Sequence, residues 1–99
     1  MNIPNNWEVI EYEYKGTTTR KVFATWRGGF ASSDNWQLNS GIVSTDETDD
    51  YYDFNGASGS VYRCYKNREG IRGMWLMDVL NGIVNKLNAK PICYTKEAQ

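Results

Sequence analysis

WEVIEYEYKGTTTRKVFATW, residues 7–26, holds the clearest structural signal in the sequence. Its first half alternates apolar residues with glutamates, which is the pattern of a strand that buries one face. Residues 15–17 favour a tight turn, and the β-branched and aromatic residues of 18–26 favour a strand that returns antiparallel to the first. The segment therefore predicts a β-hairpin, in which one face of the second strand carries Val22, Ala24 and Trp26.

Further strands are predicted on the C-terminal side of this hairpin. Residues 27–35 are rich in Gly, Ser and Asn and predict a loop, and residues 36–44 predict a third strand. Asn39-Ser40-Gly41 in the middle of that strand indicates a bulge or a break. Residues 50–54 and 60–65 predict a second hairpin, because the residues between them favour a turn.

The hydrophobic pattern then changes to a helical period. From about Arg72 to Asn88, apolar residues recur at the spacing of an amphipathic helix, and Pro91 prevents its continuation. Residues 92–94 predict a short last strand. We therefore expect an α+β fold in one domain, residues 1–99, with a mainly antiparallel sheet of about five strands (two hairpins) and one C-terminal helix packed on one face. The side chains expected to be largely buried are Trp26, Val61, Leu76, Leu80, Ile83 and Leu87.

The composition favours one small folded domain and argues against several kinds of site. Aromatic residues make up 14% of the 99 residues, which is enough for one core. With two cysteines and no histidine, a zinc site is nearly excluded. We expect Cys64 and Cys93 to be small apolar core residues, with a disulfide between them as the alternative. No apolar run is long enough to cross a bilayer and no export signal is evident, so we expect a cytoplasmic protein.

Charge is distributed unevenly along the chain. Residues 28–62 contain six acids and no Lys or Arg, so this window carries −6, whereas the rest, with all 11 bases and six acids, carries +5. Five of the six acids fall in residues 46–53, beside two tyrosines. Neighbouring carboxylates repel one another, and no base lies close in the sequence to relieve them.

Three interpretations of residues 46–53 remain open. The first is a solvated turn whose acids keep a sheet edge soluble. The second is a Ca²⁺ loop, although the segment lacks the ligand spacing and the distal Glu of such loops. The third is an acidic, tyrosine-bearing surface that meets a basic groove of a partner protein, since complementary charge speeds encounter. The partner-binding residues in that third interpretation are Asp46, Glu47, Asp49, Asp50, Tyr51, Tyr52 and Asp53.

A basic pole follows the acidic segment. In residues 62–72 cations alternate with tyrosines, as in proteins that hold phosphates and stack bases. No motif of an established RNA-binding fold accompanies them, and the net charge of −1 argues against nucleic acid as the main partner. The cations of this pole are Arg63, Lys66, Arg68 and Arg72.

The residue types argue against catalysis. General acid–base chemistry near neutral pH most often uses histidine, which is absent. The carboxylate pairs Asp49/Asp50 and Glu11/Glu13 are more simply explained as residues of a turn and of an exposed strand than as catalytic pairs. Cys64 has no histidine to accept its proton. We expect no enzymatic activity, no catalytic residue, no bound metal and no cofactor.

In type, the chain resembles a group of small inhibitors. TWRGGFASSDNWQLNSGI (25–42) and FNGASGSVYRCYKNREG (54–70) are similar to segments of small prophage proteins. A short, histidine-free, aromatic-rich acidic domain with a segregated carboxylate cluster resembles the anti-CRISPR proteins that phages and mobile elements direct against bacterial defences. The resemblance implies a viral protein of the bacterial host cytoplasm, a nucleic-acid mimic that inhibits a CRISPR–Cas complex or another defence effector. The resemblance does not assign a role to any individual residue.

Two other functions stay open. One is a small nucleic-acid-binding or regulatory module that uses the basic aromatic strand from Arg63 to Arg72. The other is a structural accessory subunit of a phage assembly. Salt-sensitive binding to bare DNA or RNA would favour the first, and self-association into a ring or filament would favour the second.

Overall fold

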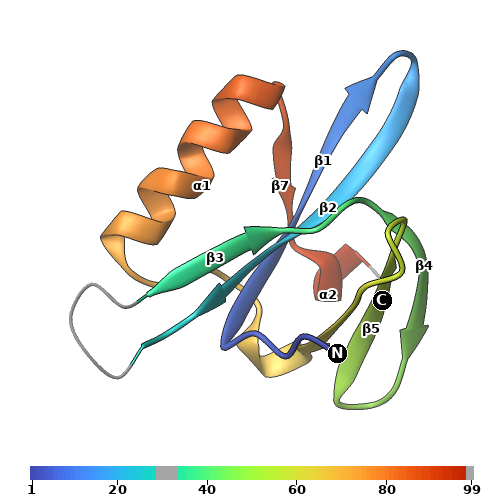
Figure 1. Cartoon of the computed structure of the whole chain (residues 1–99), viewed down its shortest axis with the longest axis vertical. Coiled ribbons are helices and arrows are strands. Elements are labelled where there is room, and N and C mark those ends of the chain that lie inside the picture. The colour runs from blue at the N-terminus through green and yellow to red at the C-terminus, as the bar shows by residue number, and fades with distance from the viewer. Residues whose placement is uncertain (29–33, 98–99) are drawn as a thin grey trace.

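The hairpin predicted from residues 7–26 is confirmed in the computed structural model, which describes residues 1–28 and 34–97 (Figure 1). Strand β1 (Asn6–Tyr14) pairs antiparallel with β2 (Thr17–Trp26). Lys15 and Gly16 connect them with positive φ angles of 51° and 79°. Two-residue turns of this kind match the right-handed twist of the strands they join.

The other described elements complete an α+β fold, as the sequence predicts. They are β3 (Asn35–Leu38), β4 (Ile42–Glu47), β5 (Tyr51–Gly56), β6 (Val61–Tyr65), the 3₁₀ turn η1 (Lys66–Arg68), α1 (Met74–Leu87), β7 (Lys90–Ile92) and α2 (Tyr94–Glu97). The predicted loop of residues 27–35 lies largely outside the described residues. The last strand, predicted at residues 92–94, lies at residues 90–92, and the short helix α2 follows it.

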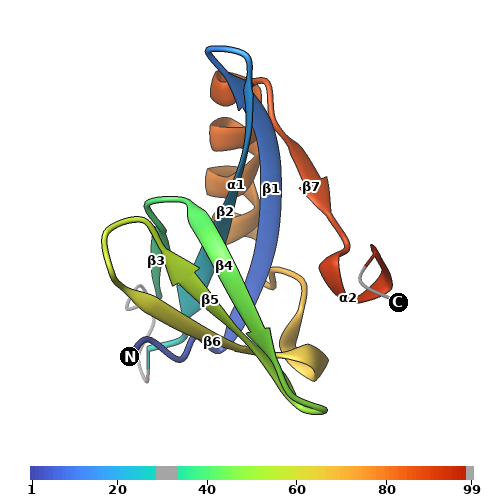
Figure 2. The ribbon, with the colours of Figure 1, turned by 90° about the vertical axis from the view of Figure 1, so that its right-hand side faces the viewer.

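The strands form two antiparallel sheets, so the expectation of one sheet of about five strands is wrong (Figure 2). One sheet has the order β3-β2-β1-β7 and the other the order β4-β5-β6. The division falls at Asn39-Ser40-Gly41, where the sequence indicated a bulge or break. The Asn39 side chain accepts a hydrogen bond from the Val22 N–H (2.8 Å), and the Asn39 N–H donates to the Val22 carbonyl (3.0 Å). Asn39 thus ends β3, and Gly41, at a φ of 128°, directs the chain into the second sheet.

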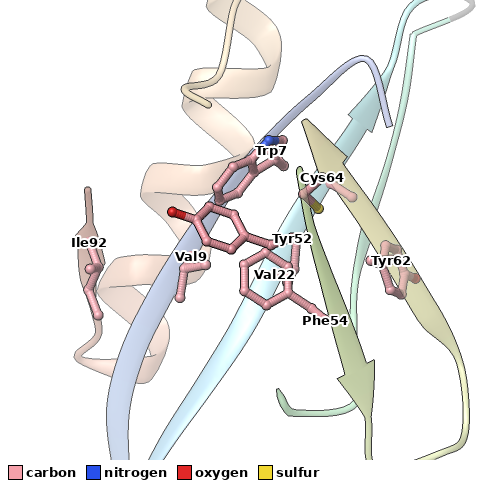
Figure 3. Packing of buried hydrophobic residues seen from close by; sticks show 9 residues of the cluster. Trp7, Val9, Val22, Tyr52, Phe54, Tyr62, Cys64 and Ile92 are labelled. Carbon is pink, nitrogen blue, oxygen red and sulfur yellow. The ribbon is translucent and has the colours of Figure 1, made fainter. Parts of the chain in front are cut away.

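An aromatic core fills the space between the two sheets (Figure 3). Trp7 is fully buried, and its ring centroid lies 5.6 Å from that of Phe54 and 6.0 Å from that of Tyr52. Cys64 from β6 and Ile92 from β7 close the cluster. Edge and tilted ring contacts of this kind add stability beyond the buried area.

Helix α1 covers the opposite face of the four-stranded sheet (Figure 1). Leu80 packs there against Ile10 and Phe23. The helix begins after Gly73, which has a φ of 97°. It ends at Asn88, which is in the left-handed conformation and donates its N–H to carbonyls of the last turn.

The expected burial is confirmed for two residues and wrong for four. Leu76 and Leu80 are each 1% exposed. The others are only partly buried. Two lie at the open margin of the single helix, one lies at the margin of the core between the sheets, and one, in β6, lies on the outer face of the small sheet. These four are Trp26, Val61, Ile83 and Leu87.

Candidate functional site

The acidic segment forms the end of the β4–β5 hairpin. Thr48 fixes the turn, since its hydroxyl oxygen accepts hydrogen bonds from the N–H groups of Asp50 (3.2 Å) and Tyr51 (3.1 Å). The Thr48 N–H also donates to the Tyr51 carbonyl at 2.9 Å. The predicted site residues are thereby divided among three positions: Asp46 and Glu47 in β4, Asp49 and Asp50 in the turn, and Tyr51, Tyr52 and Asp53 in β5.

Part of the acidic charge is neutralised by the basic pole. Arg63 holds Asp53 with two parallel hydrogen bonds of 2.9 and 3.0 Å. Lys66 contacts Glu47 with an Nζ–Oε2 distance of 2.6 Å. These hydrogen bonds raise the pKa of Arg63 and of Lys66. The acidic segment and the basic pole are separate in the sequence, but these two ion pairs bring them into contact in the fold.

Three carboxylates remain exposed and carry no ion pair within the described ranges: Asp46, Asp49 and Asp50. We call these three residues the acidic end. Asp46 accepts a hydrogen bond from the Asn55 side-chain amide at 3.1 Å, so its carboxylate is oriented but not neutralised. Strand β4 is also an edge of its sheet, and this supports the interpretation of edge-protecting acids as well.

The two tyrosines of the segment point to opposite faces of the small sheet. Tyr52 is 2% exposed and belongs to the aromatic core, so its assignment as a partner-binding residue is wrong. Side chains alternate along a strand, and Tyr51 therefore lies on the outer face. The Arg63 guanidinium lies 4.1 Å from its ring centroid, and the Tyr65 ring meets it edge-on at 5.4 Å. Of the two tyrosines in the acidic segment, Tyr51 is the one with an accessible ring.

The other arginines of the basic pole lie at a different place. Arg68 and Arg72 line a hollow of about 320 Å³ together with Arg27, which the sequence analysis did not single out. We call this the arginine hollow. The remaining lining residues are Asn5, Asn6 and Asn67. The lining residues come from segments that are far apart in the sequence. The pairing of β1 with β2 and the loop after β6 bring these segments together.

A further hollow, of about 340 Å³, is lined by Glu8, Glu69, Gly70, Pro91, Ile92 and Cys93. Burial raises the pKa of the Glu8 carboxyl, and the neighbouring Glu69 carboxylate adds to the rise. Glu69 itself accepts hydrogen bonds from the N–H groups of Tyr94 and Thr95. Its carboxylate therefore serves to hold the start of α2.

Replacing Glu8 with glutamine is expected to raise the melting temperature at neutral pH. The folded-state pKa of Glu8 lies above its ordinary value of 4.5, so the folded state favours the neutral carboxyl. The stability tied to this group is present below pH 4.5 and is lost as pH rises through the folded-state pKa. Thermal melts across this range should show the gain of Glu8→Gln at neutral pH and its disappearance in acid. An equal gain at both ends of the range would contradict the role of ionisation.

Both cysteines are free, so the alternative of a disulfide is wrong. Cys64 is buried in the aromatic core, as expected, whereas Cys93 is exposed. Burial raises the pKa of the Cys64 thiol far above its usual range, which keeps it protonated and unreactive.

The described residues contain no group of three or more His, Cys, Asp or Glu side chains that could hold a metal ion. Within the same part of the chain, no helix has the length and apolarity to cross a membrane.

Comparisons with known proteins returned no match for this chain. A scan against protein-family models, a search of curated proteins and a search of solved structures were all negative.

Proposed function

We propose that this chain is a non-enzymatic protein inhibitor that uses the acidic end as a mimic of nucleic acid. In this proposal a phage or mobile element encodes it, and it blocks a bacterial defence effector such as a CRISPR–Cas complex by occupying the basic surface meant for DNA or RNA. The observation that carries the proposal is the exposure of Asp46, Asp49 and Asp50, without an ion pair among the described residues, on a hairpin whose turn Thr48 fixes.

Charge and geometry both favour a cationic partner surface. The five acids of residues 46–53, set against Arg63 and Lys66, leave a net charge of −3 at this end of the small sheet. Carboxylates on a fixed turn offer acceptors to Arg and Lys side chains without the entropic cost of ordering a loop. Tyr51 adds a ring whose burial against a partner would strengthen the contact.

The alternative of a nucleic-acid-binding module has less support in its original form. Of its four cations, Arg63 and Lys66 are already paired with Asp53 and Glu47. DNA or RNA lying along β6 would also meet the carboxylates of the adjoining hairpin, and like charges in contact are unfavourable.

The double substitution Asp49→Asn and Asp50→Asn is expected to weaken partner binding about tenfold, mainly through a slower on-rate, because steering by complementary charge is lost. Both residues are exposed turn residues, so the fold should be unaffected. A matched control, Glu13→Gln with Asp78→Asn, removes two exposed acids that lie outside every ion pair of the described residues.

The measurement compares the three proteins as baits in a bacterial host lysate, followed by kinetics on the purified partner over a range of salt concentrations. We expect one partner to be retained by the parent and the control, to be released by the double variant, and to be displaced by its own nucleic acid. Equal retention by the double variant would show that the acidic end does not bind the partner and is only a solvated, edge-protecting turn.

A further inference from the structure

The arginines of this chain divide into two classes. Arg20 and Arg63 are ion-paired with carboxylates. The remaining three, Arg27, Arg68 and Arg72, line the arginine hollow, and none of them takes part in an ion pair among the described residues. They come from the residue after β2, from η1 and from the segment before α1, so the fold itself gathers them.

Asparagine side chains hold two of these segments in place. The Arg27 N–H donates to the Asn5 side-chain oxygen at 2.8 Å. The Asn6 side-chain amide, on a residue that is only 5% exposed, donates to the Arg68 carbonyl at 3.1 Å. Both asparagines line the hollow as well. The backbones of Arg27 and Arg68 are therefore fixed by hydrogen bonds, while their guanidinium groups remain available.

The loop that carries Arg68 has two further attachments to β1. The Trp7 indole N–H donates to the Tyr65 carbonyl at 2.8 Å, and the Gly70 N–H donates to the Trp7 carbonyl at 2.8 Å. Both ends of this loop are thus tied to a residue at the centre of the core. A binding group on such a loop is held in position before its ligand arrives, which lowers the cost of binding.

Three guanidinium groups around one hollow repel one another unless an anion lies between them. Among the described residues, no carboxylate lines the hollow. The acid nearest in sequence to Arg27 among the described residues is Asp34, and its carboxylate accepts a hydrogen bond from the Gly28 N–H at 3.3 Å. Helix α1 begins two residues after Arg72, with no side-chain cap and no acid in its first turn, so its positive end adds to the same potential.

We propose that the arginine hollow binds a compact phosphate-class anion, such as a diphosphate or the phosphate end of a small metabolite. Planar guanidinium groups bind phosphate oxygens through paired hydrogen bonds, and the asparagine amides can supply neutral donors. The volume of about 320 Å³ lies at the small end of ligand sites.

The surroundings of the hollow favour a small anion over a polymer. The Lys66 N–H, at the start of η1, donates to the Asp50 carbonyl at 2.9 Å, so the acidic end adjoins the segment that carries Arg68. A nucleic-acid strand running across the hollow would meet these carboxylates, whereas a compact ligand confined to the hollow would not.

The test is calorimetric titration of the intact chain with inorganic pyrophosphate, in a phosphate-free buffer whose ionic strength is matched with chloride. Each of Arg27→Gln, Arg68→Gln and Arg72→Gln should weaken binding about tenfold, since each removes charge-assisted hydrogen bonds. The triple variant should show no binding. Lys86→Gln, which removes a cation at the far end of α1, should bind like the parent.

Three results would overturn the proposal. They are the absence of pyrophosphate binding to the parent at millimolar concentration, unchanged binding by the triple variant, and tighter binding of a single-stranded oligonucleotide than of pyrophosphate. Equal melting temperatures of the parent and the arginine variants in the absence of ligand show that the variants are folded. The acidic-end double variant should retain pyrophosphate binding, so the outcome is independent of the proposed inhibitor function.

Discussion

Replacing Trp7 with alanine is expected to lower the free energy of unfolding by about 3–5 kcal/mol, the usual cost of removing a large buried aromatic side chain. Trp7 is fully buried between the sheets and contacts Tyr52 and Phe54. The substitution also leaves the Tyr65 carbonyl without its indole donor. Because domains of this size are stable by only about 5–15 kcal/mol, the variant should lose a large part of its stability. Denaturant titration followed by circular dichroism measures the change.

Trp26→Ala is the matched control for this experiment. Trp26 is also a tryptophan that donates to a backbone carbonyl, that of Ile3 at 3.1 Å, but it is only partly buried at the margin of the same core. Its removal should cost less than half as much. Equal effects of the two substitutions would show that Trp7 is not the centre of the interface between the sheets.

Leu80→Ala is expected to destabilise the protein by about 2–5 kcal/mol, because it leaves a cavity beneath α1. Leu80 is 1% exposed and is the buried contact of the helix with Ile10 and Phe23. The same denaturant titration measures this change. A loss below about half a kcal/mol would mean that the helix is not seated on this face, since deletions of buried methyl groups cost more.

Met77→Ala serves as the control for the helix. Met77 lies on the same helix but is 38% exposed, so its truncation removes little buried area. Its effect should stay within about half a kcal/mol, the usual range for surface substitutions. A large effect would indicate that the outer side of α1 is covered in solution.

Local patterns were sufficient to predict the β1–β2 and β5–β6 hairpins and the helix, but not the hairpin of β4 with β5. The alternation in residues 7–14, the turn at Lys15 and the helical spacing around Leu80 are all set by neighbours in the sequence. The partition into two sheets was not predictable in this way. It depends on the hydrogen bonds between Asn39, after β3, and Val22 in β2, and these become evident only when the strand partners are known.

The candidate site was predictable to a similar extent. Clustering of charge identified the acidic segment, but not its partial neutralisation. A signal for the pair of Asp53 and Arg63 existed, because a turn centred on residue 58 places them opposite one another across the hairpin. Tyr52 was misassigned because the face buried by each strand depends on the second sheet. Arg27 was missed because its neighbours in the hollow are far away in the sequence.

The position of β7 determines the order in which this fold can be completed. Its three residues pair with Val9, Ile10 and Glu11, so the sheet is closed by segments from opposite ends of the described chain. The hairpins join residues that are near in sequence, whereas this pairing closes a loop of nearly the whole chain, at a higher cost in entropy. Since β7 follows α1 after two residues, Asn88 and Ala89, the docking of β7 also draws the helix onto its face of the sheet. Folding should therefore wait on this last pairing, with the local hairpins forming and dissolving until it occurs.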